Sequence, residues 1–155
     1  MYNSITKERE VFKMKLFTMV GLPGSGKSTF SKSRQNCVVV DLDGIRKELY
    51  GDEAIQGDGR TVISIAFNRI TVALTEGKDV IFDGTNVTIN RRKQLIKRFS
   101  TADHVAVFVN TPVEECKRRN ASRNRHVPEK VIDRYARQLV APKLEEGFQE
   151  IIIIK

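Results

Sequence analysis

The chain has 155 residues, of which 40% are hydrophobic and 30% charged, and its formal net charge is +8. This length and composition are typical of one soluble globular domain with a sizeable core. No apolar run approaches the roughly 18 residues that a membrane-spanning helix needs, and the polar N-terminus lacks the apolar segment of a signal peptide. We therefore expect an intracellular, cytoplasmic protein without a membrane partner, in which Cys37 and Cys116 are reduced.

Five short apolar runs alternate with longer amphipathic segments along the chain. The runs are continuous, which is typical of strands buried on both faces of a parallel sheet. They predict strands at residues 16–20, 37–40, 80–82, 105–109 and 151–154, with helices at 27–35, 43–50, 60–76, 90–99, 112–120 and 129–139. This alternation predicts an α/β three-layer sandwich around a central parallel sheet of about five strands. We expect residues 1–13 to form a flexible lead-in and residues 14–155 to form a single domain.

A glycine-rich segment, GLPGSGKS at residues 21–28, follows the first predicted strand and precedes a predicted helix. Its spacing, G-x-x-x-x-G-K-[ST], is that of a P-loop, whose backbone N–H groups surround the phosphates of a nucleotide. The lysine of such a loop reaches the β- and γ-phosphates, and the following hydroxyl binds Mg²⁺. We therefore expect ATP and Mg²⁺ as cofactors, Ser28 as a metal ligand, and ATP-binding residues Gly21, Leu22, Pro23, Gly24, Ser25, Gly26, Lys27, Ser28 and Thr29.

The second predicted strand runs into two carboxylates, in VVVDLDGIRKEL at residues 38–49. An apolar run followed by Asp-x-Asp-Gly is typical of haloacid-dehalogenase-type phosphatases, but it also suits the general base of a kinase. A phosphatase of that type needs further acidic residues at later strand ends, whereas the strand at 105–109 is followed by Asn-Thr-Pro. The P-loop, together with the lack of an acidic residue after that strand, favours a kinase over a phosphatase. We also expect Asp43 to cap the helix that follows it.

Five residues fit a kinase site at the carboxyl ends of the strands, where such folds bind ligands. Asp43 is the better candidate for the catalytic base, because Arg46 follows one helical turn later on the same face and can hold a phosphate of the acceptor. Asp83 ends the third strand, either as a simple turn residue or as a carboxylate that holds Mg²⁺ through water. Thr85 and Asn86 lie at the edge of this site, and we assign them to substrate binding.

An arginine-rich segment, KRRNASRNR at residues 117–125, joins two predicted helices. Arg119 and Arg123 can face the site together, in a lid at residues 119–127 that closes over ATP and neutralises transition-state charge. Residues 91–125 contain ten Lys or Arg and three Asp or Glu, a local charge of +7. Such a stretch is either a solvated face or a surface for a polyanionic partner.

From about residue 16 to residue 154, the chain resembles the P-loop polynucleotide 5′-hydroxyl kinases of nucleic-acid end repair, within the wider AAA_33 and zeta-toxin-like P-loop kinases. The resemblance rests on residues 21–29, on Asp43-x-x-Arg46, on Asp-x-Thr-Asn at 83–86, on Arg119-Asn-x-x-Arg123 and on YARQLVAPKLEEGF at 135–148. It implies an adenylate-kinase-like sheet with a small arginine-bearing lid. It also implies transfer of the ATP γ-phosphate to the 5′-OH of DNA or RNA.

The same resemblance implies a role for each matching residue. Asp43 would be the general base, and Arg46 would hold the 3′-phosphate of the acceptor. Lys27 and Arg123 would act on the transferring phosphoryl group, with Arg119 and Arg125 in the lid. Asp83 would support the Mg²⁺.

Two alternatives remain open at the level of the sequence. No phosphatase or ligase module accompanies the kinase motifs, and related small P-loop kinases phosphorylate other hydroxyls, such as those of small molecules or of hydroxymethylated bases in DNA. A non-catalytic ATP-dependent switch would also carry a P-loop, although it would give no role to Asp43 and Arg46. The sequence does not distinguish DNA from RNA, and it leaves the oligomeric state open.

Overall fold

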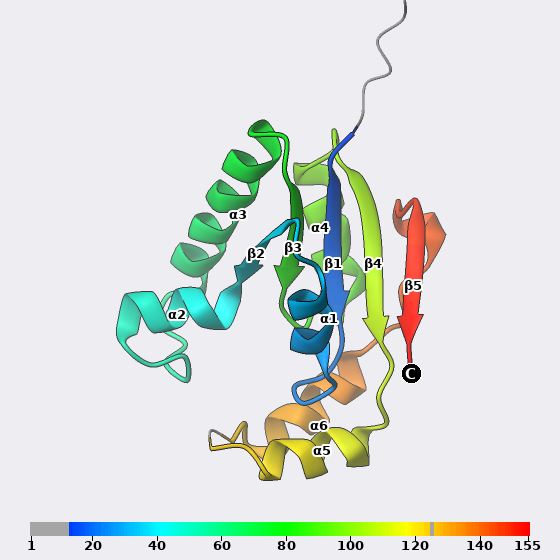
Figure 1. Cartoon of the computed structure of the whole chain (residues 1–155). Coiled ribbons are helices and arrows are strands. Elements are labelled where there is room, and N and C mark those ends of the chain that lie inside the picture. Colours follow the sequence, from blue (N-terminus) through cyan, green and yellow to red (C-terminus); the bar gives the residue numbers. More distant parts are fainter. Residues whose placement is uncertain (1–12, 125) are drawn as a thin grey trace, which may run out of the picture.

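The computed structural model describes residues 13–124 and 126–155, and within them a five-stranded sheet forms the centre of the molecule (Figure 1). All neighbouring strands are parallel, in the order β2-β3-β1-β4-β5. They are β1 (Lys15–Val20), β2 (Cys37–Asp41), β3 (Asp79–Asp83), β4 (Asp103–Val109) and β5 (Glu150–Ile154). Each contains one predicted apolar run, so the predicted α/β fold is confirmed. The predicted lead-in lies outside the described residues except for the exposed Lys13.

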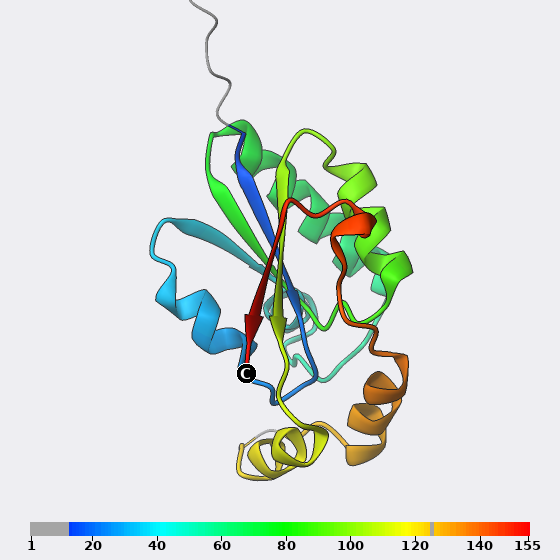
Figure 2. The same cartoon turned by 90° about the vertical axis from the view of Figure 1, so that its right-hand side faces the viewer.

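Helices lie on both faces of the sheet (Figure 2). On one face is α1 (Lys27–Ser33), and on the other are α3 (Gly59–Thr75) and α4 (Ile89–Arg98). Beside β2, α2 (Leu42–Tyr50) packs against α3, while α5 (Val113–Ala121) and α6 (Glu129–Gln138) pack together beyond the carboxyl ends of the strands. A short 3₁₀ helix, η1 (Leu144–Glu146), precedes β5. None of the helices in the described part of the chain is long and apolar enough to cross a bilayer.

Successive side chains of each strand point to opposite faces of the sheet, and they enter two separate cores. Leu16 and Phe82 pack in the core beneath α3 and α4, together with Ile70. Phe17 and Ile81, their neighbours in the strands, pack in the core beneath α1. Burial of each such side chain stabilises the fold by about 1.5–3 kcal/mol. The pattern explains why the apolar runs are continuous.

The start of α2 differs from the expectation. Asp41, not Asp43, is the N-cap: its two carboxylate oxygens accept hydrogen bonds from the backbone N–H groups of Asp43 and Gly44, both at 3.1 Å. A capping residue must keep an extended backbone while its side chain turns toward the helix. Asp41, the last residue of β2, has φ −108° and ψ 121°, whereas Asp43 already lies in the first helical turn. The prediction that Asp43 caps the helix is therefore wrong, and its carboxylate is not used for capping.

A buried ion pair connects α4 with η1. The side chain of Arg92 is 0% exposed and that of Glu146 is 5% exposed. The Nε and Nη2 atoms of Arg92 donate to the two carboxylate oxygens of Glu146 at 2.8 and 2.7 Å. Its Nη1 atom donates to the carbonyls of Asn86 and Val87, both at 3.0 Å. The C-terminal motif thus fixes the loop after β3, and one charge of the basic stretch lies in the interior.

Candidate functional site

A cavity of about 470 Å³ lies at the carboxyl ends of the strands. Its walls come from the loop after β1, the end of β3, the start of α2 and the connection between α5 and α6. The predicted site residues that line it are Pro23, Gly24, Gly26, Lys27, Ser28, Asp43, Arg46, Asp83, Thr85, Asn86 and Arg123. Of the other predicted residues, Gly21, Leu22, Ser25, Thr29 and Arg119 belong to the loop or its support rather than to the wall, and Arg125 lies outside the described residues.

The loop between β1 and α1 has the backbone geometry of a phosphate cradle. Gly24 and Gly26 have φ angles of 81° and 104°, in the left-handed region that glycine adopts without strain. A Cβ atom on Gly24 would lie 2.6 Å from the carbonyl oxygen of Cys116 in α5, so no larger residue fits there. Loops with such alternating conformations form concave nests of N–H groups that bind anions. The residues present therefore fit a bound nucleotide phosphate.

Lys27 folds back over this loop. Its Nζ atom donates to the carbonyls of Gly21 and Leu22, at 3.0 and 2.9 Å. Burial lowers the pKa of Lys27, and the nearby carboxylate of Asp83 opposes this shift. The ammonium group therefore lies over the loop, and its hydrogen-bond partners in the loop are backbone carbonyls. A charged phosphate oxygen would be a stronger partner than a carbonyl. The buried hydroxyl of Ser25 has no hydrogen-bond partner within residues 13–124 and 126–155.

Carboxylates gather on the opposite side of Lys27. Asp41 and Asp83 end neighbouring strands and face each other in register. Burial raises the pKa of Asp83 to about 6, against the attraction of Lys27 and with the help of the Asp41 and Asp43 charges. Burial and the charge of Asp43 also raise the pKa of Asp41. Among the described residues, no cluster of three or more His, Cys, Asp or Glu side chains could hold a metal ion. The residues thus fit a Mg²⁺ held mainly by phosphate oxygens, a hydroxyl and water, which is how Mg²⁺ usually binds in nucleotide sites.

The first turn of α2 presents a carboxylate and a guanidinium side by side. Arg46 donates from Nη1 to Oδ1 of Asp43 at 2.8 Å, and both residues line the cavity. The side chain of Asp43 is 52% exposed and that of Arg46 is 19% exposed. The Nε atom of Arg46 is buried, and it has no hydrogen-bond partner in the described part of the chain. This arrangement can accept a proton at Asp43 and bind an anion at Arg46.

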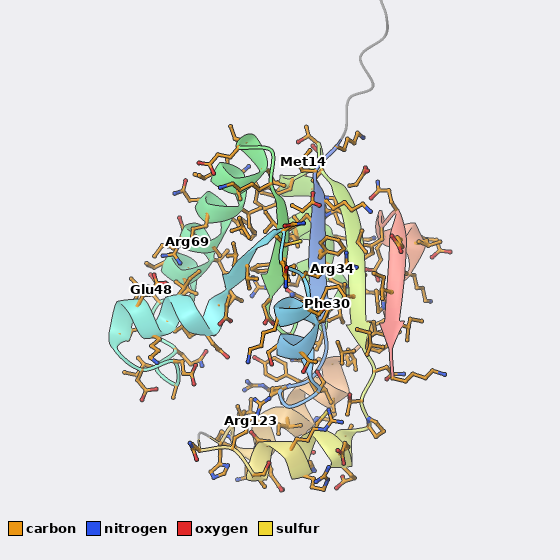
Figure 3. The ribbon with its side chains drawn as sticks, in the orientation of Figure 1. Met14, Phe30, Arg34, Glu48, Arg69 and Arg123 are labelled. Carbon is orange, nitrogen blue, oxygen red and sulfur yellow. The ribbon has the colours of Figure 1, made fainter. Side chains whose placement is uncertain are left out.

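The predicted lid, residues 119–127, comprises the end of α5 and most of the connection to α6, and its two described arginines lie differently. Arg119 packs against the phosphate loop, donating from Nη1 to the Ser25 carbonyl at 3.2 Å and from Nε to Glu115 at 2.8 Å. Arg123 follows the end of α5 and lines the cavity, where its charge further lowers the pKa of Lys27 (Figure 3). Arg119 therefore contacts the phosphate loop, whereas Arg123 lines the cavity.

The path of this connection depends on Asn120. The side chain of Asn120 is buried, and its Nδ2 and Oδ1 atoms bond the carbonyl and the N–H of Val127 at 2.6 and 2.9 Å. The ring Nδ1 of His126 lies 2.9 Å from the Asn120 carbonyl. A buried asparagine with both amide atoms paired holds a loop in one path. The Asn of the Arg-Asn-x-x-Arg motif is thus a structural residue.

Asn86 is a second buried asparagine whose side chain stabilises a loop of the site. Its backbone φ is 45°, its side chain is buried, and its Nδ2 atom donates to the Met19 carbonyl at 2.8 Å. The loop carbonyl of Thr85 accepts the Gly21 N–H at 3.1 Å. The segment after β3 is therefore hydrogen-bonded to the end of β1 and to the first residue of the phosphate loop. Thr85 and Asn86 therefore line the cavity and also stabilise the position of the phosphate loop.

Part of the cavity wall was not anticipated from the sequence. It consists of Leu42, Glu53, Ala54, Gln56, Arg91, Pro128, Val131 and Tyr135, while His126 and Val127 belong to the predicted lid. The loop after α2 reaches the cavity because the Tyr50 hydroxyl accepts the Asp58 N–H at 3.1 Å. A Cβ on Gly57 would lie 2.1 Å from the Tyr50 ring, so this closure requires a glycine. A polar loop between two helices carries no sequence signal for such a position, although Tyr135 does occur in the C-terminal motif.

A family model described as an AAA domain matches residues 16–142. A protein of Acanthamoeba polyphaga mimivirus, which bears the name of a bifunctional polynucleotide phosphatase/kinase, is 31% identical over 150 residues, covering 90% of this chain and 32% of its own length. Two structures of the Pnkp1/Rnl/Hen1 RNA repair complex contain a similar fold. One has a TM-score of 0.77 and 24% identity, over 86% of this chain and 46% of that one; the other has 0.66 and 26%, over 79% and 42%.

The chain spans about a third of the length of the curated relative it matches, and less than half of each of these structures. The family match covers most of the chain, and the loop geometry described above agrees with nucleotide binding by a P-loop. The chain therefore belongs to the AAA domain family whose model it matches, with a P-loop kinase fold related to that of polynucleotide kinases.

Proposed function

We propose that the chain is a polynucleotide 5′-hydroxyl kinase, which transfers the γ-phosphate of ATP to the 5′-OH of a DNA or RNA strand. The observation that carries this proposal is the Asp43–Arg46 pair, which shares one cavity with the phosphate loop. A general base and an anion-binding guanidinium, one helical turn apart, suit an acceptor that carries both a hydroxyl and a phosphate. The name of the mimivirus relative and the RNA repair complex support the same class of acceptor.

On the donor side, the loop from Gly21 to Thr29 would surround the phosphates of ATP. Lys27 would exchange its two loop carbonyls for oxygens of the β- and γ-phosphates. Ser28 and, through water, Asp83 would hold the Mg²⁺, which neutralises charge on the phosphates when it is bound. Arg119 and Arg123 would add positive charge beside the transferring group, where such charge stabilises the transition state.

On the acceptor side, Asp43 would accept the proton of the attacking 5′-OH, and Arg46 would bind the 3′-phosphate of the same nucleotide. Asp43 suits the role of base better than its two neighbours. Both oxygens of Asp41 accept N–H groups of α2, and Asp83 would support the Mg²⁺ on the donor side. Thr85 and Asn86 would form the wall against which the acceptor lies.

The hydrogen bonds of Asp41 argue against the phosphatase alternative. A phosphatase of the Asp-x-Asp-Gly type needs the first aspartate as its nucleophile, with an unhindered carboxylate oxygen. In this chain that residue is Asp41, and its two oxygens cap α2 at 3.1 Å. A carboxylate used in this way is less nucleophilic toward a phosphate, because both of its oxygens already accept hydrogen bonds.

The test is transfer of labelled γ-phosphate from ATP to a single-stranded oligonucleotide with a 5′-OH, with a nucleoside that lacks a 3′-phosphate as the second acceptor. We expect label on the oligonucleotide, little on the nucleoside, and a fall in kcat of about 10²–10⁴-fold for Asp43→Asn. Glu48→Gln is the matched control, because it makes the same change on the same helix, where Glu48 pairs with Arg69 and is not part of the cavity wall.

Two results would contradict the proposal. If the nucleoside or another small hydroxyl compound accepts phosphate as well as the oligonucleotide does, the acceptor is a small molecule. If Asp43→Asn transfers phosphate at the rate of Glu48→Gln, Asp43 is not the base.

A further inference from the structure

A second, shallower groove adjoins the cavity, and we call it the α3–α4 groove. It is lined by Asp58, Gly59, Arg60, Ile63 and Arg91. Arg91 also lines the main cavity, so the groove continues from the wall of the site toward the first turns of α3 and α4. The sequence motifs assign no role to these residues.

The two arginines of the groove differ from Arg69, Arg92 and Arg118, which are paired with carboxylates. Arg92 pairs with Glu146, Arg69 with Glu48, and Arg118 with Glu115. Arg60 and Arg91 are exposed, and within residues 13–124 and 126–155 neither guanidinium has an ion pair or a hydrogen bond. The nearby carboxylate of Asp58 is engaged by its own helix, since it accepts from the Arg60 N–H at 3.0 Å and from the Thr61 hydroxyl at 3.2 Å.

We propose that the α3–α4 groove binds a backbone phosphate of the acceptor strand, one or more nucleotides beyond the phosphate held by Arg46. This inference rests on the proposed function, and it deepens it: the enzyme would recognise a strand rather than a single nucleotide. Two unpaired guanidinium groups suit a phosphate, which an arginine can bind through two parallel hydrogen bonds. The groove offers Ile63 but no aromatic side chain on which a base could stack. Binding there would therefore be independent of sequence.

The test compares two acceptors of different length, and the longer one offers further backbone phosphates. One is a nucleoside 3′-monophosphate, which has the phosphate for Arg46 alone, and the other is a 5′-OH trinucleotide with a 3′-phosphate. Arg60→Gln and Arg91→Gln each remove one charge from the groove. Lys93→Gln is the matched control, because Lys93 is exposed on α4 two residues after Arg91 and lines neither the cavity nor the groove.

For wild-type protein and Lys93→Gln, we expect the trinucleotide to have the higher kcat/KM. For Arg60→Gln and Arg91→Gln, we expect the ratio of the two kcat/KM values to fall about tenfold, as for loss of one charge-assisted hydrogen bond. The slope of log kcat/KM against log salt for the trinucleotide should become shallower by about one unit.

Each contrary outcome has a separate meaning. If both groove variants keep the wild-type ratio, or if Lys93→Gln lowers it equally, the groove does not bind the strand and the inference fails while the proposed function stands. If wild-type protein transfers phosphate to neither acceptor, the proposed function fails and the inference falls with it.

Discussion

Two arginine–carboxylate pairs in this molecule have the same chemistry and opposite surroundings. Arg92 and Glu146 lie in the interior, where all three nitrogens of the guanidinium donate to partners at 2.7–3.0 Å. Arg46 and Asp43 lie in the cavity wall, where Arg46 donates one hydrogen bond of 2.8 Å to Asp43 and its buried Nε has no partner among the described residues. The first pair is complete without a ligand, whereas the second leaves donor capacity unused.

The charges around the two pairs differ in the same way. The positive charge of Arg92 is balanced by Glu146, and the pair connects α4, the loop after β3 and η1. Near the second pair, Asp41 and Asp83 add two carboxylates, and their pKa values are raised mainly by burial. An interior pair with all its donors used and a cavity whose carboxylates have raised pKa values are therefore found within one small fold, and perturbed pKa values of this kind are typical of functional sites.

The largest effect we expect is the loss of the interior pair. Glu146→Gln leaves the charge of Arg92 buried without an anion, and breaking a buried pair in this way costs about 3–5 kcal/mol of unfolding free energy. Urea denaturation, followed by circular dichroism, measures it. The double variant Arg92→Met/Glu146→Met removes both charges and should lose less than Glu146→Gln alone. An unchanged midpoint for Glu146→Gln would show that solvent reaches Arg92 and that the contrast between the two pairs is false.

The second effect concerns a carboxylate of the cavity, Asp83, whose removal is expected to raise the free energy of unfolding, whereas removal of Glu146 lowers it. The pKa of Asp83 is about 6 in the folded chain, above its ordinary value of 3.8, so between these pH values the folded state binds more protons than the unfolded state. Stability from this group is therefore complete below pH 4 and is lost as the pH rises through about 6. At pH 7–8 the cost approaches about 3 kcal/mol, at 1.36 kcal/mol for each pKa unit.

Asp83→Asn removes this cost while keeping the size of the side chain. We expect the ligand-free variant to match the wild type near pH 4 and to be more stable at pH 7–8, by up to the amount given above. Urea denaturation at several pH values measures the difference. A variant that is less stable than the wild type at pH 8 would mean that the attraction between Asp83 and Lys27 outweighs the burial of the carboxylate.

A third, smaller effect distinguishes the contribution of the planar guanidinium group of Arg46 from that of its charge. Arg46→Lys keeps the positive charge but loses the planar group that can bind a phosphate through two hydrogen bonds. We expect kcat/KM for a 5′-OH oligonucleotide to fall about 10–100-fold, in line with the about 1.5–3 kcal/mol of a hydrogen bond to a charged group. The KM for ATP should not change. An equal rise in the KM for ATP would assign Arg46 to the nucleotide rather than to the acceptor.

Much of the fold and of the site could be predicted because the relevant signals are local. Continuous apolar runs predict buried parallel strands, and all five runs lie within the strands that the structure describes. The glycines of the phosphate loop are needed by the backbone itself, as the φ of 104° at Gly26 illustrates. Asp43 and Arg46 follow each other by one helical turn, so any helix at that place brings them together.

The failures concern contacts between segments that are distant in the sequence. Arg92 lies in a basic stretch, and only folding brings it to Glu146, 54 positions later. The charge of this stretch is therefore less available than its composition indicates, since Arg118 and Arg119 also share Glu115. The cap at Asp41 was missed for a different reason, because the exact boundary between a strand and a helix decides which of two nearby aspartates is the cap.

The smallest effect is expected at a pair on the surface, which separates burial from geometry. Glu48 of α2 and Arg69 of α3 point toward one another in Figure 3, and two hydrogen bonds join them, as in the interior pair. The pKa of Glu48 is lowered by these bonds, yet the side chains are 58% and 44% exposed, so water and salt screen the attraction. We expect Glu48→Gln to leave the urea midpoint unchanged within error at 0.15 M salt. A loss comparable to that of Glu146→Gln, persisting in 1 M salt, would mean that the paired geometry, rather than burial, makes Arg92 and Glu146 important to the fold.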